Sequence, residues 1–129
     1  MGFLRDDGDL EGLLTLVTPN VIYEETGTGR RVQGVEDYRE LVRGWRQAFS
    51  DVNGKVTSSL ESGNRVALEV TWNGTHDGPL PLPTGEVPPT GKSIEIQASI
   101  WCTLDGARVA EIHNYLDLLT MLQQIGVLS

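Results

Sequence analysis

The stretch from Ile94 to Leu104 alternates apolar and polar side chains more cleanly than any other part of the chain, and this period of two constrains the fold more than any other feature. The dipeptide Asp105-Gly106 follows it and favours a tight hairpin turn. We therefore expect Arg108–Leu116 to be the return strand of an antiparallel hairpin. One side of the first strand carries Ile94, Ile96, Ala98, Ile100, Cys102 and Leu104, and the other carries Glu95, Gln97, Ser99, Trp101 and Thr103.

Helical patterns precede this hairpin. Residues 9–17 carry leucines at a spacing of three and four, and Pro19 is expected to stop that helix. Residues 35–49 give the clearest amphipathic pattern, with Arg39, Arg43 and Arg46 expected on the polar face. The remaining expected elements are strands over 21–25, 55–61 and 66–72 and a short helix over 118–125 that Gly126 caps. The order predicts an α+β fold, with helices on one face of a curved antiparallel sheet and an apolar pocket between them.

The segment from Gly78 to Gly91 is rich in proline, which can neither donate to a sheet nor continue a helix. We interpret it as a long loop or a lid, because loops of this length inside compact domains are often functional.

Length and composition favour one globular domain over residues 1–129. The formal net charge of −8 repels phosphate backbones and anionic lipid, so neither nucleic acid nor a membrane is an expected partner. Cys102 is the single cysteine, and Met1–Asp9 holds no apolar leader, so a cytoplasmic location is expected. His76 and His113 have no acidic cluster at a metal-ligand spacing, so we predict no metal.

Four side chains of the last strand would share one face: Glu111, His113, Tyr115 and Asp117. If that face lines an apolar cavity, burial raises the pKa of a carboxyl group and lets it carry a proton. The alternative interpretations are structural: Asp117 as the N-cap of the terminal helix, His113 as a satisfied histidine and Tyr115 as packing. Since neither row of this strand is cleanly apolar, the sequence leaves the inward face open.

Other candidates would contact a ligand. His76 precedes the proline-rich segment, where a pocket mouth or an exposed loop is expected. The aromatic residues Trp45, Phe49, Trp72 and Trp101 can line a cavity or simply fill the core.

Several motifs together resemble the SnoaL-like polyketide cyclases of the nuclear transport factor 2-like superfamily. They are Gly74-Thr75-His76-Asp77-Gly78, Pro89-Thr90-Gly91, Glu111 through Asp117, LTMLQQIG at 119–126, GDLEGLLTLVTPNVIY at 8–23 and the Gly34 start of the long helix. The resemblance implies a cone-shaped α+β barrel with a deep pocket, and homodimers through the sheet. It also implies a cofactor-free aldol cyclisation in which Asp117 is the acid/base. Two departures are His113, where a tryptophan is usual, and the short Met1–Asp7, which leaves the family's first helix largely missing.

Three functions remain open at this point. The favoured one is a cofactor-independent enzyme that acts on a polycyclic, polyketide-like ketone or ester, with Asp117 and His113 as catalytic residues. The substrate would contact His76, Gln97, Trp101, Trp45, Phe49, Trp72, Tyr115 and Tyr23. The alternatives are a non-catalytic binder of an apolar molecule, and a related hydroxylase, isomerase or epoxide hydrolase. An epoxide hydrolase is disfavoured because the strand 94–104 holds no Arg-x-Asp pair.

Overall fold

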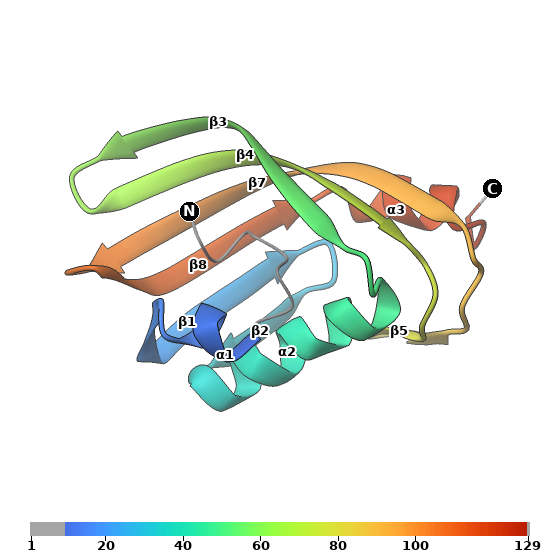
Figure 1. Cartoon of the computed structure of the whole chain (residues 1–129), viewed down its shortest axis with the longest axis horizontal. Coiled ribbons are helices and arrows are strands. Elements are labelled where there is room, and N and C mark those ends of the chain that lie inside the picture. Colours follow the sequence, from blue (N-terminus) through green and yellow to red (C-terminus); the bar gives the residue numbers. More distant parts are fainter. Residues whose placement is uncertain (1–9, 129) are drawn as a thin grey trace.

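A computed structural model describes residues 10–128, which form a strongly bent sheet around one long helix (Figure 1). The expected departure at Met1–Asp7 lies outside these described residues. In chain order the elements are α1 (Leu10–Leu14), β1 (Val17–Thr26), β2 (Arg30–Gln33), α2 (Val35–Ala48), β3 (Asn53–Ser62), β4 (Arg65–Thr75), β5 (Leu80–Leu82), β6 (Gly85–Val87), β7 (Ser93–Asp105), β8 (Arg108–Leu116) and α3 (Leu118–Gln124).

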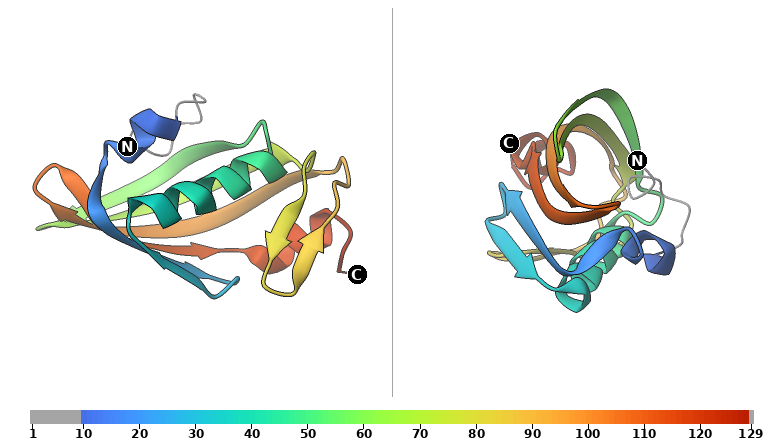
Figure 2. Two further views of the ribbon diagram at one scale, coloured as in Figure 1. Left: turned by 90° about the horizontal axis from the view of Figure 1, so that it is seen from below. Right: turned by 90° about the vertical axis from the view of Figure 1, so that its left-hand side faces the viewer.

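The main sheet has six strands in the order β2-β1-β8-β7-β4-β3. All neighbours are antiparallel except β1 and β8, which run parallel. The sheet curls over α2, and α3 lies beside the end of β7 (Figure 2). The expected α+β architecture is therefore confirmed, and the parallel pair is the part that no local pattern in the sequence indicates.

The alternation in β7 determines which side of the sheet faces the core. Ile94, Ile96 and Ile100 are buried, as are Leu68 and Val70 of the neighbouring β4. From the opposite side, α2 contributes its apolar stripe, which includes the buried Tyr38 and Leu41. A hydrophobic core therefore fills the space between α2 and the concave face of the sheet.

A bulge in β8 explains why neither row of this strand looked cleanly apolar. Thr103 pairs with Glu111, but the next residue of β7, Leu104, pairs with Val109, so Ala110 is an extra residue. Val109 and Ile112 are consequently both buried although three positions separate them. Beyond the bulge, the even-numbered residues of β8 face inward.

The proline-rich segment is more ordered than the expected loop. It contains the short hairpin of β5 and β6, and the side chain of Leu80 is 1% exposed. Gly78 lies so close to α2 that a Cβ atom there would be 1.9 Å from the carbonyl oxygen of Gln47. Leu80 joins Phe49, Met121 and Ile125 in a second apolar cluster, so this hairpin packs against the far end of the core.

The first helix is shorter than expected. It ends at Leu14, and Pro19 lies inside β1, where β1 and β8 shift in register between Val17 and Ile22. A proline is tolerated at such an irregular position because no ladder hydrogen bond is required of it. Among residues 10–128, no helix is long and apolar enough to cross a bilayer.

Candidate functional site

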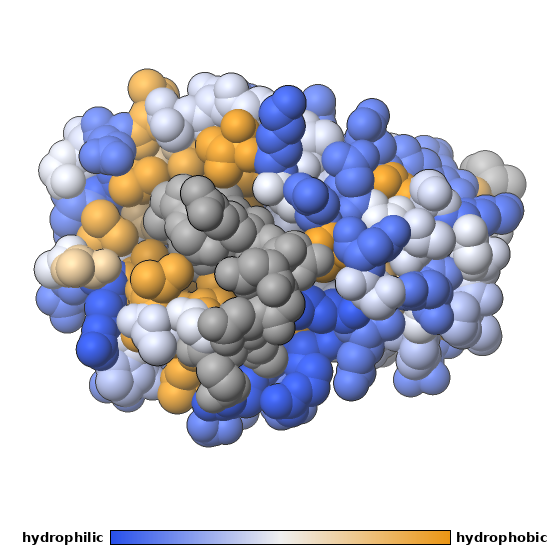
Figure 3. Space-filling view, in the orientation of Figure 1, coloured by the Kyte–Doolittle hydropathy of each residue, from blue (hydrophilic) through white to orange (hydrophobic). Residues whose placement is uncertain are grey.

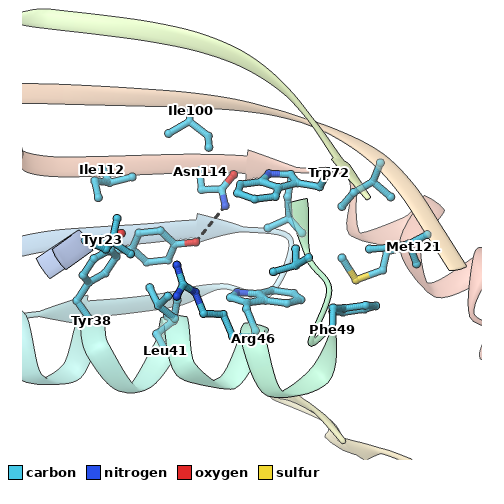
Figure 4. Close-up of a pocket in the computed structure, with 17 residues that line it drawn as sticks. Tyr23, Tyr38, Leu41, Arg46, Phe49, Trp72, Ile100, Ile112, Asn114 and Met121 are labelled. Carbon is cyan, nitrogen blue, oxygen red and sulfur yellow. Dashed lines mark hydrogen bonds between the residues drawn. The ribbon is translucent and has the colours of Figure 1, made fainter. Parts of the chain in front are cut away.

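An apolar cavity of about 130 Å³ lies between α2 and the inner face of the sheet (Figure 4). Its aromatic lining comes from Tyr23, Tyr38, Trp45, Phe49 and Trp72. Its aliphatic lining comes from Leu13, Leu41, Val42, Val52, Ile94, Ile96, Ile100, Ile112, Leu116 and Met121. Only Arg46 and Asn114 add a charged or amide group to the lining. Such a concave apolar site with few polar groups is typical of a small-molecule pocket.

The buried carboxylate of Glu25 lies next to this cavity, where Tyr23 and Trp45 of the lining hydrogen-bond to it. The side chain of Glu25 has no exposure and accepts five hydrogen bonds. Two come from Arg30, at 3.0 Å from Nε and 2.7 Å from Nη2. The others come from the Thr28 hydroxyl at 2.6 Å, the Trp45 indole at 2.9 Å and the Tyr23 hydroxyl at 2.5 Å. Full hydrogen bonding compensates the cost of burying this charge and immobilises Tyr23 and Trp45 in the cavity wall.

The Tyr23 hydroxyl connects this carboxylate to the opposite strand. It accepts a hydrogen bond of 3.0 Å from Nδ2 of Asn114 on β8. Burial, followed by the negative charge of Glu25, raises the pKa of Tyr23 well above its usual value. Tyr23 therefore keeps its proton at neutral pH and acts as a fixed hydrogen-bonding group.

Arg46 brings a positive charge to the apolar lining. Figure 4 shows its side chain extending from α2 towards Tyr23 and Tyr38. Burial raises the pKa of Tyr38, and the positive charge of Arg46 opposes that rise, which places the guanidinium near this hydroxyl. Within residues 10–128, Arg46 has neither an ion pair nor a hydrogen bond. The expected placement of Arg46 on the outer face of α2 is therefore wrong.

Four of the expected ligand contacts line the cavity: Tyr23, Trp45, Phe49 and Trp72. Their periodic spacing brought them to the inner faces of β1, α2 and β4. Three others lie on the outer face of the sheet, because they are on the opposite row of their strands: Gln97, Trp101 and Tyr115. These three do not line the inner cavity, so contact between them and a ligand stays a prediction.

The expected catalytic pair also lies outside. His113 stacks on Tyr115 with ring centroids 4.1 Å apart, and its Nε2 is 3.1 Å from the Thr26 hydroxyl. Asp117 borders a shallow polar hollow on the outer face, together with Gln97 and Tyr115. Neither His113 nor Asp117 lines the cavity, so the condition that their row faces inward is not met.

Asp117 is exposed and caps α3. One carboxylate oxygen accepts a hydrogen bond of 3.1 Å from the backbone of Thr120, and the other accepts one of 2.6 Å from its hydroxyl. These bonds favour the charged form, so the pKa of Asp117 is lowered rather than raised. The N-cap interpretation is confirmed, and the expected burial with a raised pKa is wrong.

His76 is fully buried instead of lying at a pocket mouth or on an exposed loop. Its Nδ1 hydrogen-bonds with Thr90, 2.9 Å from the hydroxyl and 3.2 Å from the backbone nitrogen, and its ring lies 5.4 Å from that of Phe49. Burial lowers the pKa of His76. It therefore supports the cavity from behind Phe49 and is not part of the lining.

Sequence reasoning missed Glu25, Arg46 and Asn114. Glu25 has a signal in hindsight, because it continues the inward row of Val21 and Tyr23. Arg46 stands four residues after Val42 and three before Phe49, both of which line the cavity. Asn114 had no signal, because the bulge hides which row of β8 is inward.

A family model for the SnoaL-like polyketide cyclases matches residues 3–125. The chain belongs to this family. Membership supports a general cyclase- or isomerase-type function. The comparison with curated proteins found no match.

Several expectations stay predictions: the homodimer, the cytoplasmic location, the absence of metal and cofactor, and the single domain over 1–129.

Similar solved structures agree with the family assignment. IdmH from Streptomyces antibioticus, a candidate polyketide cyclase, is 26% identical with a TM-score of 0.77, and the match covers 97% of this chain and 91% of IdmH. AclR from Streptomyces galilaeus, a candidate hydroxylase, is 25% identical with a TM-score of 0.76, covering 93% of this chain and 72% of AclR. A SnoaL-like protein from Jannaschia sp. CCS1 is 22% identical and has a TM-score of 0.82 over 96% of this chain and 83% of its own, which shows the shared fold.

Proposed function

We propose that this SnoaL-like protein binds a small enolisable ketone in its inner cavity and promotes a cyclase- or isomerase-type reaction through the enolate, with Arg46 binding the enolate oxygen. The observation that carries this proposal is a guanidinium in an apolar lining, without an acidic partner among residues 10–128. Arg46 is half-buried, and a charge held partly out of water attracts an anion more strongly than one in bulk water.

The chemistry follows from what the lining holds and from what it lacks. Among the described residues, no carboxylate lines the cavity, so the substrate itself must be acidic enough to ionise, as a 1,3-dicarbonyl compound is. Arg46 then stabilises the negative charge on oxygen. In an aldol-type ring closure, the substrate first loses a proton from carbon to water. The enolate carbon then bonds to a second carbonyl carbon of the same molecule as the π bond of that carbonyl opens, and the resulting alkoxide takes a proton back from water.

The size of the cavity limits the substrate. An apolar protein cavity of roughly 150 Å³ accommodates benzene. The volume of about 130 Å³ therefore suits one ring or a chain that closes into one ring. A polycyclic ketone would require the aromatic walls to move apart, so we propose a smaller substrate than the polycyclic one expected from the sequence.

The test uses pentane-2,4-dione, whose enolate absorbs ultraviolet light at a longer wavelength than its neutral forms. The dione is titrated with base in the presence of excess protein. Because Arg46 stabilises only the charged form, the pKa of the bound dione should fall by about 1 unit or more. Arg46→Met should remove that shift.

Arg43→Met is the matched control. Arg43 lies on the same helix but is exposed and paired with Glu40 at 2.5 Å. The same change in charge should therefore leave the pKa of the bound dione unchanged. If Arg43→Met and Arg46→Met have equal effects, the general charge of the protein explains the shift, and the proposal is wrong.

A second candidate is a binder that performs no chemistry. The lack of a carboxylate in the described lining favours it, because no side chain there can remove a proton from carbon at neutral pH. The two candidates differ in the titration: a binder that holds only the neutral dione raises its pKa, whereas the enolate-stabilising site lowers it.

A further inference from the structure

The side-chain oxygen of Asn114 is a buried hydrogen-bond acceptor that has no partner within residues 10–128. The nitrogen of the same amide is occupied, since it donates to the Tyr23 hydroxyl at 3.0 Å. A buried amide oxygen without a donor costs free energy that a ligand hydroxyl can recover.

The network behind Tyr23 fixes which end of this amide is free. Glu25 is paired with Arg30, and as a carboxylate it can only accept hydrogen bonds. The single proton of the Tyr23 hydroxyl is therefore donated to Glu25, over 2.5 Å. Tyr23 can then only accept from Asn114, which requires the amide nitrogen and not the oxygen on that side (Figure 4).

The free oxygen belongs to a residue of the cavity wall and is itself buried. Asn114 lines the cavity from β8, and Figure 4 shows its oxygen on the side of Trp72, away from the Tyr23 hydroxyl. Arg46 is the charged group of the lining and can only donate. Beside the Tyr38 hydroxyl, the lining therefore offers one charged donor and, in the Asn114 oxygen, an acceptor without a partner in residues 10–128.

We infer that Asn114 makes the cavity selective for ligands that carry a hydroxyl donor, such as an enol or a phenol, in addition to the oxygen that Arg46 binds. The inference rests on the proposed function, because both use the same cavity. The substrate class is thereby narrowed to enolised 1,3-dicarbonyl compounds and hydroxyaryl ketones of about one ring.

The experiment compares phenol with toluene, which has a methyl group in place of the hydroxyl. Dissociation constants are measured by NMR titration of the wild type and of Asn114→Leu, whose side chain has a similar size and no acceptor. Because the two ligands differ in hydration, the readout is the ratio of the toluene constant to the phenol constant. This ratio should be about fivefold to tenfold higher in the wild type.

A second arm tests the orientation of the amide with anisole, which has an oxygen acceptor but no donor. In Tyr23→Phe the amide nitrogen loses its partner and the amide can rotate. The preference of the wild type for phenol over anisole should then fall by about fivefold. Tyr115→Phe, the same chemical change on the outer face of β8, should leave both ratios unchanged.

Three results would count against the inference. Equal toluene-to-phenol ratios in the wild type and Asn114→Leu, with toluene still bound, overturn it and leave the cavity as a ligand site. An unchanged phenol-to-anisole preference in Tyr23→Phe also overturns it, and this arm decides the question if Asn114→Leu does not fold. No binding of any of the three compounds to the wild type overturns the proposed function together with the inference.

Discussion

The two faces of β8 carry different chemistry, although their residues alternate along one strand. The inner row of Ile112, Asn114 and Leu116 lines the apolar cavity. The outer row has the stacked rings of His113 and Tyr115, which are exposed or half-exposed. The outer row contains the residue types that are common in catalytic sites. The apolar surroundings that shift the pKa of a side chain, however, are on the inner face. Residue type alone is thus a poor guide to a site, because burial determines what the group can do.

The largest expected effect is a difference in stability between substitutions at two adjacent glutamates of β1, whose side chains face opposite sides of the sheet. Glu25→Ala should lower the free energy of unfolding by about 4 kcal/mol, because it leaves Arg30, Trp45 and Tyr23 without their buried acceptor. Glu24→Ala should cost at most about 1 kcal/mol, since the bond of Glu24 to Arg31 lies at the surface. Urea unfolding of both variants measures the difference. Equal losses would mean that the Glu25 network does not stabilise the fold.

A smaller contrast is expected within β8 itself. Ile112 is 3% exposed, and Ile112→Ala should cost about 3 kcal/mol because it enlarges the cavity and removes packing. Tyr115 is 45% exposed, and Tyr115→Ala should cost less than about 1 kcal/mol. Thermal and urea unfolding test both values. A larger loss for Tyr115→Ala would show that the outer face of the monomer is covered in solution.

The sequence was sufficient for the parts of the fold that depend on local periodicity. Alternation predicted both the hairpin of β7 and β8 and the buried row of β7, and a spacing of three and four predicted α2. The pairing of β1 with β8 could not be predicted in this way, because a parallel contact between distant segments leaves no local pattern.

The candidate site was predictable only where a clear row of side chains existed. The aromatic residues Tyr23, Trp45 and Trp72 were found because their elements are regular. The inward face of β8 was not, because a single extra residue at Ala110 exchanges the two rows. The burial of Glu25 could not be predicted either. Its hydrogen-bond donors Arg30 and Trp45 are brought together only by the fold, and no local pattern in the sequence shows this.

A substitution at Asp117 tests how much the N-cap of α3 contributes to stability. Asp117→Ala should lower the free energy of unfolding by about 1 kcal/mol at neutral pH, since the first turn of α3 loses its acceptor. The hydrogen bonds from Thr120 hold the folded pKa of Asp117 below its ordinary value of 3.8, so this contribution is present above that pH and disappears as the pH falls through the folded pKa. Wild type and variant should then converge in acid. Asp117→Asn keeps the cap, and neither change should alter phenol binding in the cavity.

The smallest expected effect concerns His76, which is buried behind the cavity wall. Burial lowers its folded pKa below the ordinary histidine value of 6.5, while the nearby charge of Asp77 opposes that shift. Below pH 6.5 the unfolded chain therefore takes up a proton more readily than the folded chain, and stability decreases until the pH passes the folded pKa. His76→Phe cannot titrate, so its stability relative to the wild type should improve as the pH falls from 7 to about 5. This window lies above that of Asp117, so the two titrations are distinguishable in one pH series of unfolding curves. If the difference in unfolding free energy between His76→Phe and the wild type stays constant across this range, then the pKa of His76 is the same in the folded and the unfolded chain, and burial behind Phe49 does not lower it.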